Sequence, residues 1–211
     1  AVLEAVEKGE LPEEEINAKC RKVLTYKYIL GLERKPFVKL SGLGTRINTP
    51  QTRDLISRLN LAAITVLNNK NDVLPLHPDL KEAAILNVGK PEEIEPFDRK
   101  MKKYTSFARF QLRKDLPEAE QQKLRDSLAA YRRVIVTVTE QRLAPYQSFF
   151  AKFAPESPVI YVFYTPAKSM LQIQRAVSAA EAVVLAHASR DDVQERVADL
   201  LFGKATADGR L

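Results

Sequence analysis

The sequence contains few of the residues that build metal, redox or nucleophile sites. Its 211 residues include no tryptophan, two histidines, two methionines and one cysteine. The single cysteine, Cys20, excludes an internal disulfide and leaves the redox compartment undetermined. His77 and His187 lie 110 positions apart, so with Cys20 they do not form the converging ligand set that a metal site needs. We therefore expect neither a metal nor a cofactor.

Several catalytic and targeting motifs are also absent. No G-x-S-x-G nucleophile motif is present, and the stretch Asn87–Lys90 offers one glycine where a dinucleotide fingerprint or a P-loop needs more. No apolar run reaches membrane length, and no signal peptide is visible, so no membrane span is expected. The first residue is not methionine, and we expect the chain to be part of a longer polypeptide.

Charge of one sign does not dominate either. The net charge is +6 and the pI is about 9.3, but 33 basic residues are interspersed with 27 acidic ones. The densest basic stretch adjoins four carboxylates and has no aromatic ladder; it contains Arg99, Lys100, Lys102 and Lys103. This pattern favours a solvated helix face over a phosphate-binding patch, so no nucleic-acid partner is expected.

The sequence does contain the apolar side chains of a folded core. A hydrophobic content of 45% over 211 residues suits one large domain, or one domain with an extra arm. Residues 1–30 have a helical pattern, with Cys20 placed as a small core residue and Gly31 as the stop. Residues 31–48 are predicted to be a linker. Thr49-Pro50 is typical of a helix start, and residues 49–211 form the main domain.

Short β-branched runs then alternate with amphipathic helical patterns. The predicted strands are 63–67, 83–88, 106–112, 134–139, 159–163 and 182–186, of which 106–112 has the weakest pattern. Helical faces are predicted for Leu124, Leu128 and Tyr131 and for Val193, Val197, Leu200 and Leu201. Thr165-Pro166 and Ser189 with Asp192 indicate further helix starts, and Gly203 a stop. Strands alternating with helices predict an α/β three-layer sandwich whose mainly parallel sheet is flanked by helices.

Open parallel sheets bind ligands beyond the carboxyl ends of their strands. The residues expected there are Asn87, Lys90, Glu140, Gln141, Arg142, Tyr164, Thr165, His187 and Arg190. Arginine and tyrosine could bind a sugar, or all of these could be solvated loop residues, which we favour. His187 and Ser189 could form a hydrolytic pair, but a capping serine beside a loop histidine is the commoner arrangement. His77, before Pro78, is interpreted as a structural turn residue.

Three segments in order resemble family 3 glycoside hydrolases. Residues 5–12 (AVEKGELP) with 23–32 (VLTYKYILGL) resemble the last barrel helix and the chain leaving it. Residues 61–70 (LAAITVLNNK) followed by 74–76 (LPL) resemble the entry into the family's second domain. Residues 198–203 (ADLLFG) and 208–211 (DGRL) resemble its end. Together they span almost the whole chain, although its middle matches mainly as a strand and helix rhythm.

The resemblance implies that residues 1–30 are the last helices of a TIM-like barrel that precedes this chain. Residues 49–211 would be the C-terminal α/β-sandwich domain of a bacterial enzyme. In that family β-glycosides are cleaved with retention through an aspartate of the barrel, which lies before residue 1. Many members take the acid/base glutamate from a second-domain loop with a K-H-F signature. The nearest segment here, residues 102–107 (KKYTSF), lacks the histidine, so no catalytic residue is assigned and the substrate-binding residues stay unknown.

The missing signature favours the β-N-acetylglucosaminidase branch, whose acid/base is a barrel histidine. We expect an accessory domain that is inactive alone, with the barrel of the same polypeptide and, through it, a carbohydrate as partners. The family implies a bacterial periplasm or cell envelope location. A β-glucosidase with a second-domain carboxylate is the first alternative. A stand-alone glycan-binding or interaction domain is the second.

Overall fold

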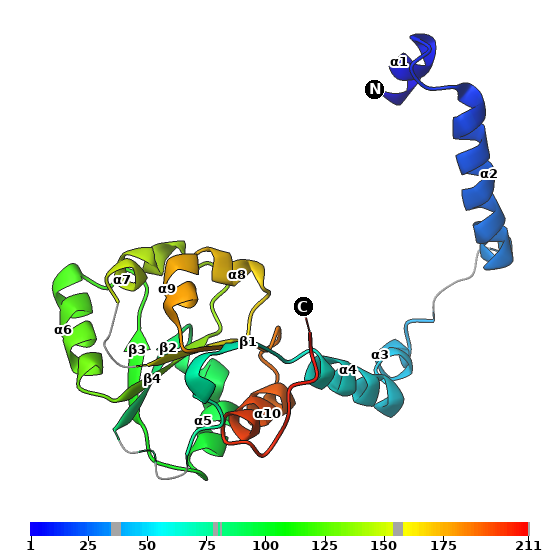
Figure 1. The fold of residues 1–211 in the computed structure, drawn as a ribbon. Helices are drawn as coiled ribbons and strands as arrows, with labels where there is room; N and C mark the ends of the chain where they lie inside the picture. Colours follow the sequence, from blue (N-terminus) through cyan, green and yellow to red (C-terminus); the bar gives the residue numbers. More distant parts are fainter. Residues whose placement is uncertain (35–38, 78–79, 81, 154–157, 211) are drawn as a thin grey trace. The chain divides into compact units, whose positions relative to one another are not determined.

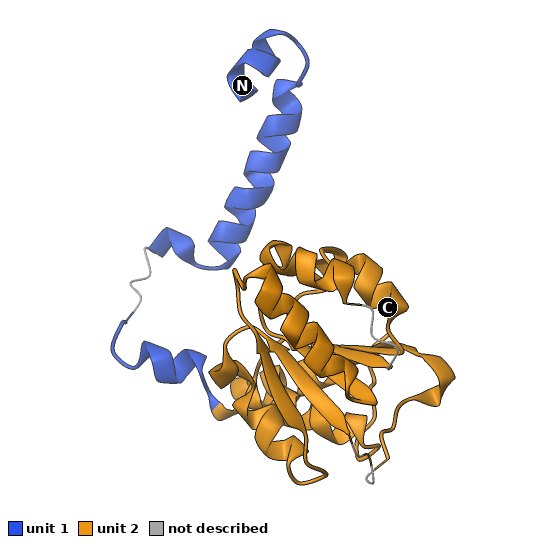
Figure 2. Ribbon diagram, turned by 90° about the vertical axis from the view of Figure 1, so that its left-hand side faces the viewer, with its two compact units in different colours: residues 1–49 blue, residues 50–211 orange. Residues whose placement is uncertain are grey.

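The computed structural model describes residues 1–34, 39–77, 80, 82–153 and 158–210. The chain divides into two compact units, residues 1–49 and residues 50–211 (Figure 2). Three features of the sequence analysis extend outside the described residues: linker residues 35–38, the turn at Pro78, and Leu211 at the end of the third family-like segment. Each unit is described by itself.

Residues 1–49 form short helices. They are α1 (Val2–Glu7), α2 (Glu13–Ile29), the 3₁₀ turn η1 (Leu32–Arg34) and α3 (Leu43–Ile47). The pattern of residues 1–30 therefore gives two helices, because Gly9, with φ +73°, and Pro12 separate them. Three glutamates lie in the first turn of α2, where they complement the helix dipole, and Gly31 with φ +70° follows its end as predicted. The expected linker contains α3.

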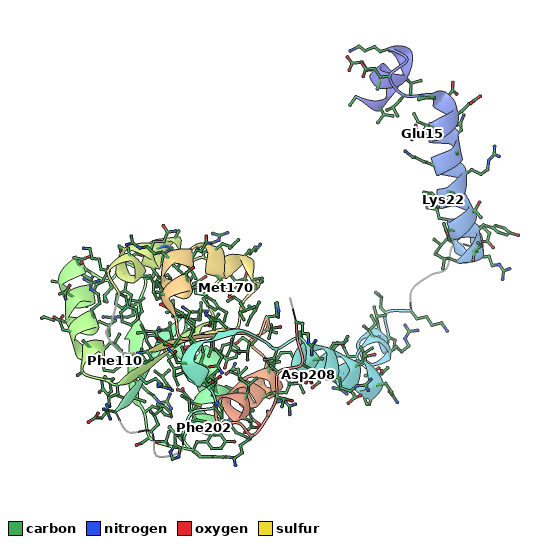
Figure 3. The ribbon with its side chains drawn as sticks, in the orientation of Figure 1. Glu15, Lys22, Phe110, Met170, Phe202 and Asp208 are labelled. Carbon is green, nitrogen blue, oxygen red and sulfur yellow. The ribbon has the colours of Figure 1, made fainter. Side chains whose placement is uncertain are left out.

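The prediction that Cys20 is a core residue is wrong. Cys20 is exposed, and α2 contains no buried residue. The apolar side chains of its second half are exposed as well, and they include Val23, Leu24, Tyr26, Tyr28 and Ile29. Side chains such as Glu15 and Lys22 project from this helix in Figure 3. Helical spacing indicates which residues share a face, but burial requires a packing partner, and the described residues of this unit, 1–34 and 39–49, do not supply one.

Residues 50–211 contain a six-stranded sheet. Its strands are β1 (Thr65–Asn69), β2 (Ala83–Val88), β3 (Ala108–Leu112), β4 (Arg133–Val138), β5 (Val159–Phe163) and β6 (Ala182–Leu185). The spatial order is β1-β6-β5-β4-β2-β3, and every pair is parallel except β1 with β6. Val134 pairs with Ala84 on one side and Val159 on the other. All six predicted strands are confirmed to within a few residues.

Helices cover both faces of the sheet, so the predicted three-layer sandwich is confirmed (Figure 1). One face packs against α6 (Glu118–Ala129), α7 (Gln147–Lys152), α8 (Lys168–Leu171) and α9 (Gln174–Ala179). The other packs against α4 (Pro50–Ala62), α5 (Glu95–Met101) and α10 (Asp191–Leu201). Alternation along β4 sends Val134 and Val136 to the first core and Ile135 to the second. Met170 and Phe202 mark the two sides in Figure 3.

The predicted helix faces of this unit are confirmed. Leu128 is fully buried with Leu124 and Tyr131 packed beside it. The predicted face of α10 is buried throughout; it consists of Val193, Val197, Leu200 and Leu201. Helix α4 begins at Pro50, and α10 ends before Gly203, whose φ is +68°.

Two predicted helix starts are wrong. The hydroxyl of Thr165 is buried without a hydrogen-bond partner, and α8 begins three residues later at Lys168. The Ser189 hydroxyl does not cap α10, whose N-cap residue is Arg190. Ser189 instead donates a 3.2 Å hydrogen bond to the carbonyl oxygen of Glu93, far away in the sequence. A long-range partner replaced the local capping bond that the sequence pattern predicts.

The end of the chain packs back on the domain. The N–H of Gly209 donates a 3.0 Å hydrogen bond to the carbonyl oxygen of Ile64, at the junction of α4 and β1. A Cβ at Gly209 would lie 2.8 Å from that same oxygen. The glycine of the third family-like segment therefore has a packing role, because only a residue without a side chain fits this approach.

Candidate functional site

The carboxyl ends of the parallel strands define the candidate site. Within the sheet, β2 lies between β3 and β4. The chain leaves β2 toward β3, whereas it leaves β4 in the opposite direction, toward β5. The loops that leave β2 and β4 therefore diverge, which creates the topological switch point where open sheets bind ligands.

A pocket of about 500 Å³ lies at these strand ends. Its size is within the range of small-molecule sites. Four connections contribute to it, namely those that follow β2, β4, β5 and β6. The lining residues are Glu92, Glu93, Pro96, Thr139, Gln141, Tyr164, Pro166, His187, Ala188, Ser189, Asp191 and Gln194.

Two hydroxyl groups of the lining have no hydrogen-bond partner within the described chain. They belong to Thr139, which follows β4, and Tyr164, which follows β5. Tyr164 is only 3% exposed, and burial, together with the nearby Asp98 carboxylate, raises the pKa of its phenol well above 10. The phenol therefore stays protonated at physiological pH and has an O–H to donate. Both hydroxyl oxygens are closed to solvent, so they lie beneath the lining and do not offer contacts to a ligand in the pocket.

His187 reaches the pocket from a strained turn. Its φ is +62°, and the N–H of Ala188 donates a 2.7 Å hydrogen bond to the carbonyl oxygen of Ala186. This i to i+2 bond makes a γ-turn centred on a residue in the left-handed region, a rare conformation. A non-glycine residue held there costs roughly 1–2 kcal/mol, and such residues concentrate at functional sites. The geometry therefore favours a ligand-contact role for His187.

Hydrogen bonds of Gln194 and Ser189 hold the segment that follows β2 against α10. The Gln194 side chain, 1% exposed, donates hydrogen bonds to the carbonyl oxygen of Glu93 (2.7 Å) and to the Ser189 hydroxyl (3.0 Å). Its own Oε1 accepts a bond from the N–H of Phe97 (3.2 Å). The Ser189 hydroxyl therefore donates to the carbonyl oxygen of Glu93. Among the described residues, it forms no hydrogen bond with His187. The conceivable Ser189–His187 hydrolytic pair does not form.

The pocket is negatively charged although the chain is basic. Glu92, Glu93 and Asp191 line it. Within the described part of the chain, none of these three carboxylates forms an ion pair with a basic side chain. A search of the described residues also finds no group of three or more histidine, cysteine or acidic side chains suited to a metal ion. The pocket therefore has an acidic lining.

Only some of the predicted strand-end residues reach the pocket. Gln141, Tyr164 and His187 line it, whereas Lys90, Glu140, Arg142, Thr165 and Arg190 do not. Arg190 pairs instead with Asp192 at 3.1 Å.

Asn87 has a structural role at the same edge. Its amide donates to the side chain of Gln111 (2.9 Å) and accepts from the hydroxyl of Thr137 (3.2 Å). The Gln111 amide in turn donates to the carbonyl oxygen of Gly89 (2.7 Å). This network joins the ends of β2, β3 and β4, so Asn87 holds the loop rather than a ligand.

The acidic lining of the pocket has no motif in the sequence that predicts it. Glu92 and Glu93 are two of the four carboxylates beside the basic stretch that is predicted to form a solvated helix face, and no motif singles out Asp191 or Gln194. One signal was available: Glu92 and Glu93 closely follow the buried strand β2, on the connection that starts the switch point. The sequence does not show which strands are neighbours in the sheet. The position of Glu92 and Glu93 after β2 therefore does not by itself indicate a site.

The segment nearest to a K-H-F signature lies away from the pocket. Residues 102–107 connect the end of α5 to the start of β3. They therefore lie at the amino ends of the parallel strands, at the opposite edge of the sheet. This segment supplies no carboxylate to the candidate site. Among the described residues, no helix is long and apolar enough to cross a membrane.

Comparisons with known proteins find similarity only in structure. No protein-family model matches the chain, and no curated protein matches its sequence. A solved structure of the beta-glucoside phosphorylase BglX has a TM-score of 0.61 and 16% identity, over 99% of this chain and 40% of that one. A glycoside hydrolase family 3 beta-N-acetylglucosaminidase from Paenibacillus sp. str. FPU-7 has a TM-score of 0.56 and 16% identity, over 99% and 41%. A beta-glucosidase from Listeria innocua with isofagomine has a TM-score of 0.54 and 15% identity, over 96% and 32%.

These identities establish similarity of fold and no more. The chain spans about two fifths of the length of the first two structures. It therefore has the α/β-sandwich fold of one part of glycoside hydrolase family 3 enzymes, as its sequence resemblance implies.

Proposed function

We propose that this chain is the accessory second domain of a glycoside hydrolase that cleaves terminal β-N-acetylglucosaminides with retention. The observation that carries the proposal is the structural match. It covers 99% of this chain but about 40% of a family 3 beta-N-acetylglucosaminidase and of a beta-glucoside phosphorylase. The carboxylate nucleophile that retention requires would lie in an N-terminal barrel of the same polypeptide. The expected location is the bacterial periplasm or envelope.

The exposed arm supports a missing partner domain. In α2, Leu24 is 57% and Ile29 is 69% exposed, and no residue of this helix is buried. Exposed apolar side chains gathered on one segment are typical of an interface. In this proposal residues 1–30 are the last helices of the barrel, and these side chains pack against it.

The amino-sugar branch is supported by the absence of a K-H-F glutamate. Residues 102–107 lack the histidine and lie at the opposite sheet edge from the pocket. The acid/base would then come from the barrel, and the pocket of this chain would contribute to the cleft rim.

A β-glucosidase is the second candidate, and one observation favours it. Glu92, Glu93 and Asp191 line the strand-end pocket without basic partners in the described structure. One of these carboxylates could act as an acid/base that completes a barrel site. The similarity to the Listeria beta-glucosidase is compatible with this candidate.

The test is an activity comparison between this chain and a version extended upstream through its whole reading frame. Both are assayed on nitrophenyl β-N-acetylglucosaminide and nitrophenyl β-glucoside. We expect hydrolysis of the amino sugar by the extended protein only. Hydrolysis of neither substrate by the extended protein, or of either by this chain alone, overturns the proposal.

Variants of the extended protein separate the two candidates. Glu92→Gln, Glu93→Gln and Asp191→Asn are made one at a time, with Glu95→Gln as the matched control outside the pocket. If a barrel histidine is the acid/base, none of the pocket variants lowers kcat by more than a few fold. A loss of 10²-fold or more in one of them alone identifies a second-domain acid/base and favours the β-glucosidase.

A further inference from the structure

We infer that the outer face of α4 is the surface through which this domain docks on its barrel, and that this docking places the strand-end pocket beside the barrel. The inference rests on the proposed function and deepens it, because it names the surface that the partner domain contacts. Three observations carry it: an apolar stripe on α4, the place of α4 in the chain, and the edge of the sheet that α4 shares with the pocket.

Helix α4 presents an apolar stripe to solvent. Leu55, Ile56 and Leu59 are 47%, 41% and 61% exposed, and Ala62 is exposed as well. At about 3.6 residues per turn, these four residues fall within an arc of about 120° around the helix. That arc also contains Thr52 but no charged residue. An exposed apolar surface without charged side chains is typical of the centre of an interface.

The stripe lies on the side of α4 opposite to the domain's own core. The hydroxyl of Ser57 donates a hydrogen bond to the carboxylate of Asp192 in α10, and Leu61 packs against the second core cluster. Both residues lie on the other side of the helix from Leu59. In Figure 1, α4 accordingly lies beside α10. The described residues therefore cover one side of α4 and leave the stripe exposed.

The position of α4 in the chain identifies the barrel as the occupant of the stripe. Helix α4 begins at Pro50, the first residue of the second compact unit. A domain that precedes residues 31–48 is therefore tethered to the sandwich at this helix, where its effective concentration is high. This chain covers 40% and 41% of two structures that share its fold, so most of each of those chains lies outside the match.

The stripe and the strand-end pocket share one edge of the sheet. Helix α4 leads into β1, and Thr65 at the start of β1 pairs with Leu185 at the carboxyl end of β6. Asp192, which accepts the hydrogen bond from Ser57, directly follows Asp191 of the pocket lining. A barrel that covers the stripe therefore borders the pocket, as a contribution of the pocket to the cleft rim requires.

Alkylation of introduced cysteines tests the docking directly. Leu59→Cys reports on the stripe, and Leu171→Cys, at a leucine 66% exposed in α8 on the other face of the sheet, is the matched control. Both are made with Cys20→Ser, in this chain and in the version extended upstream. Alkylation by N-ethylmaleimide is followed by peptide mass spectrometry. We expect Leu59→Cys to react about tenfold or more slowly in the extended protein, and Leu171→Cys to react equally in both.

A charge placed in the stripe should remove the protection. In the extended protein, Leu59→Glu combined with Leu55→Cys should restore alkylation to within about threefold of the rate in this chain, because an interface does not readily bury an unpaired carboxylate. Leu171→Glu combined with Leu55→Cys should leave alkylation slow. In this chain alone neither glutamate should change the urea midpoint, since both positions are exposed.

Equal alkylation of Leu59→Cys in the two proteins overturns the inference. Slower alkylation of this chain at higher protein concentration overturns it as well, because a second copy would then be the occupant. Either result leaves the proposed glycosidase function standing, since hydrolysis is measured separately. Protection of Leu59→Cys in an extended protein that cleaves neither nitrophenyl sugar would support the docking and overturn the proposed activity.

Discussion

The two units of this chain contain similar apolar side chains but bury them to different extents. Leu24 and Ile29 of residues 1–49 are more than half exposed, whereas Phe97 and Leu128 of residues 50–211 are fully buried. The glycines differ in the same way. A Cβ at Gly44 would meet nothing within 4 Å, while one at Gly89 would lie 1.9 Å from the Thr139 hydroxyl oxygen. Local pattern is sufficient to form a helix, but only tertiary packing makes an individual side chain indispensable.

The largest contrast is expected from truncation of apolar side chains. Phe97→Ala removes a fully buried ring that packs edge-to-face on Tyr164, so it should cost about 3–5 kcal/mol of unfolding free energy. Leu24→Ala, at an exposed position of α2, should change it by less than about 0.5 kcal/mol. Urea denaturation of both variants measures the difference. A comparable loss in Leu24→Ala would mean that α2 is packed in solution.

The glycines provide the next contrast. Gly89→Ala should cost about 1–3 kcal/mol, because its φ is +141° and the new Cβ meets Thr139. Gly44→Ala lies inside α3 with open space, and should be neutral or increase helicity slightly. Thermal unfolding and circular dichroism measure both. Adding Thr139→Ala to Gly89→Ala should restore part of the loss, and no restoration would mean that backbone strain alone destabilises the variant.

The contribution of ion pairs to the unfolding free energy should depend on pH differently in the two units. Burial opposes ionisation of Asp192, but hydrogen bonds from Ser57 and Arg190 outweigh it and lower its pKa. A lowered folded-state pKa contributes stability that is present above the ordinary aspartate pKa and is lost as pH falls. Asp192→Asn should therefore cost about 1 kcal/mol at pH 7, discounted for partial exposure, and less below pH ~4.

The matched control in residues 1–49 is Glu15. A hydrogen bond from Lys19 lowers the pKa of Glu15, but both side chains are exposed. Glu15→Gln should leave the unfolding midpoint unchanged at every pH. A pH-independent loss in Asp192→Asn would show that the contact between α4 and α10 does not depend on this charge.

The smallest effect is expected at His187. His187→Gly frees a residue held at φ +62°, and this gain is partly offset by the flexibility of glycine in the unfolded chain. The net result should be a stabilisation of about 0.5 kcal/mol, measured by urea denaturation. A destabilised variant would show that the histidine ring serves packing instead.

Much of the fold was predictable because its signals are local. The β-branched runs of β4 and β5 identify buried parallel strands, and the faces of α6 and α10 follow from helical spacing. The weaker pattern of 106–112 has a physical reason: β3 is an edge strand, and most of its side chains are only partly buried. Thr165 and Ser189 were predicted wrongly as caps, because capping depends on where the chain turns and on long-range competitors such as Glu93.

The site was predictable only in part. Its edge followed from the parallel sheet, and Gln141, Tyr164 and His187 were among the residues expected there. The acidic lining could not be inferred, because Glu92 and Asp191 are almost a hundred residues apart. They follow β2 and β6, whose neighbours in the sheet are set by the topology.

By itself the sequence determined the positions of strands and helices, the α/β class and the resemblance to one enzyme family. These depend on side-chain periodicity, backbone preference and short motifs, which act over a few residues. Tertiary structure alone decided the strand order, the antiparallel edge strand β1, the exposure of Cys20 and the gathering of three carboxylates around Tyr164 and His187. Each of these depends on which distant segment supplies the hydrogen bonds and the apolar surface. The total free energy of the fold determines which segment that is.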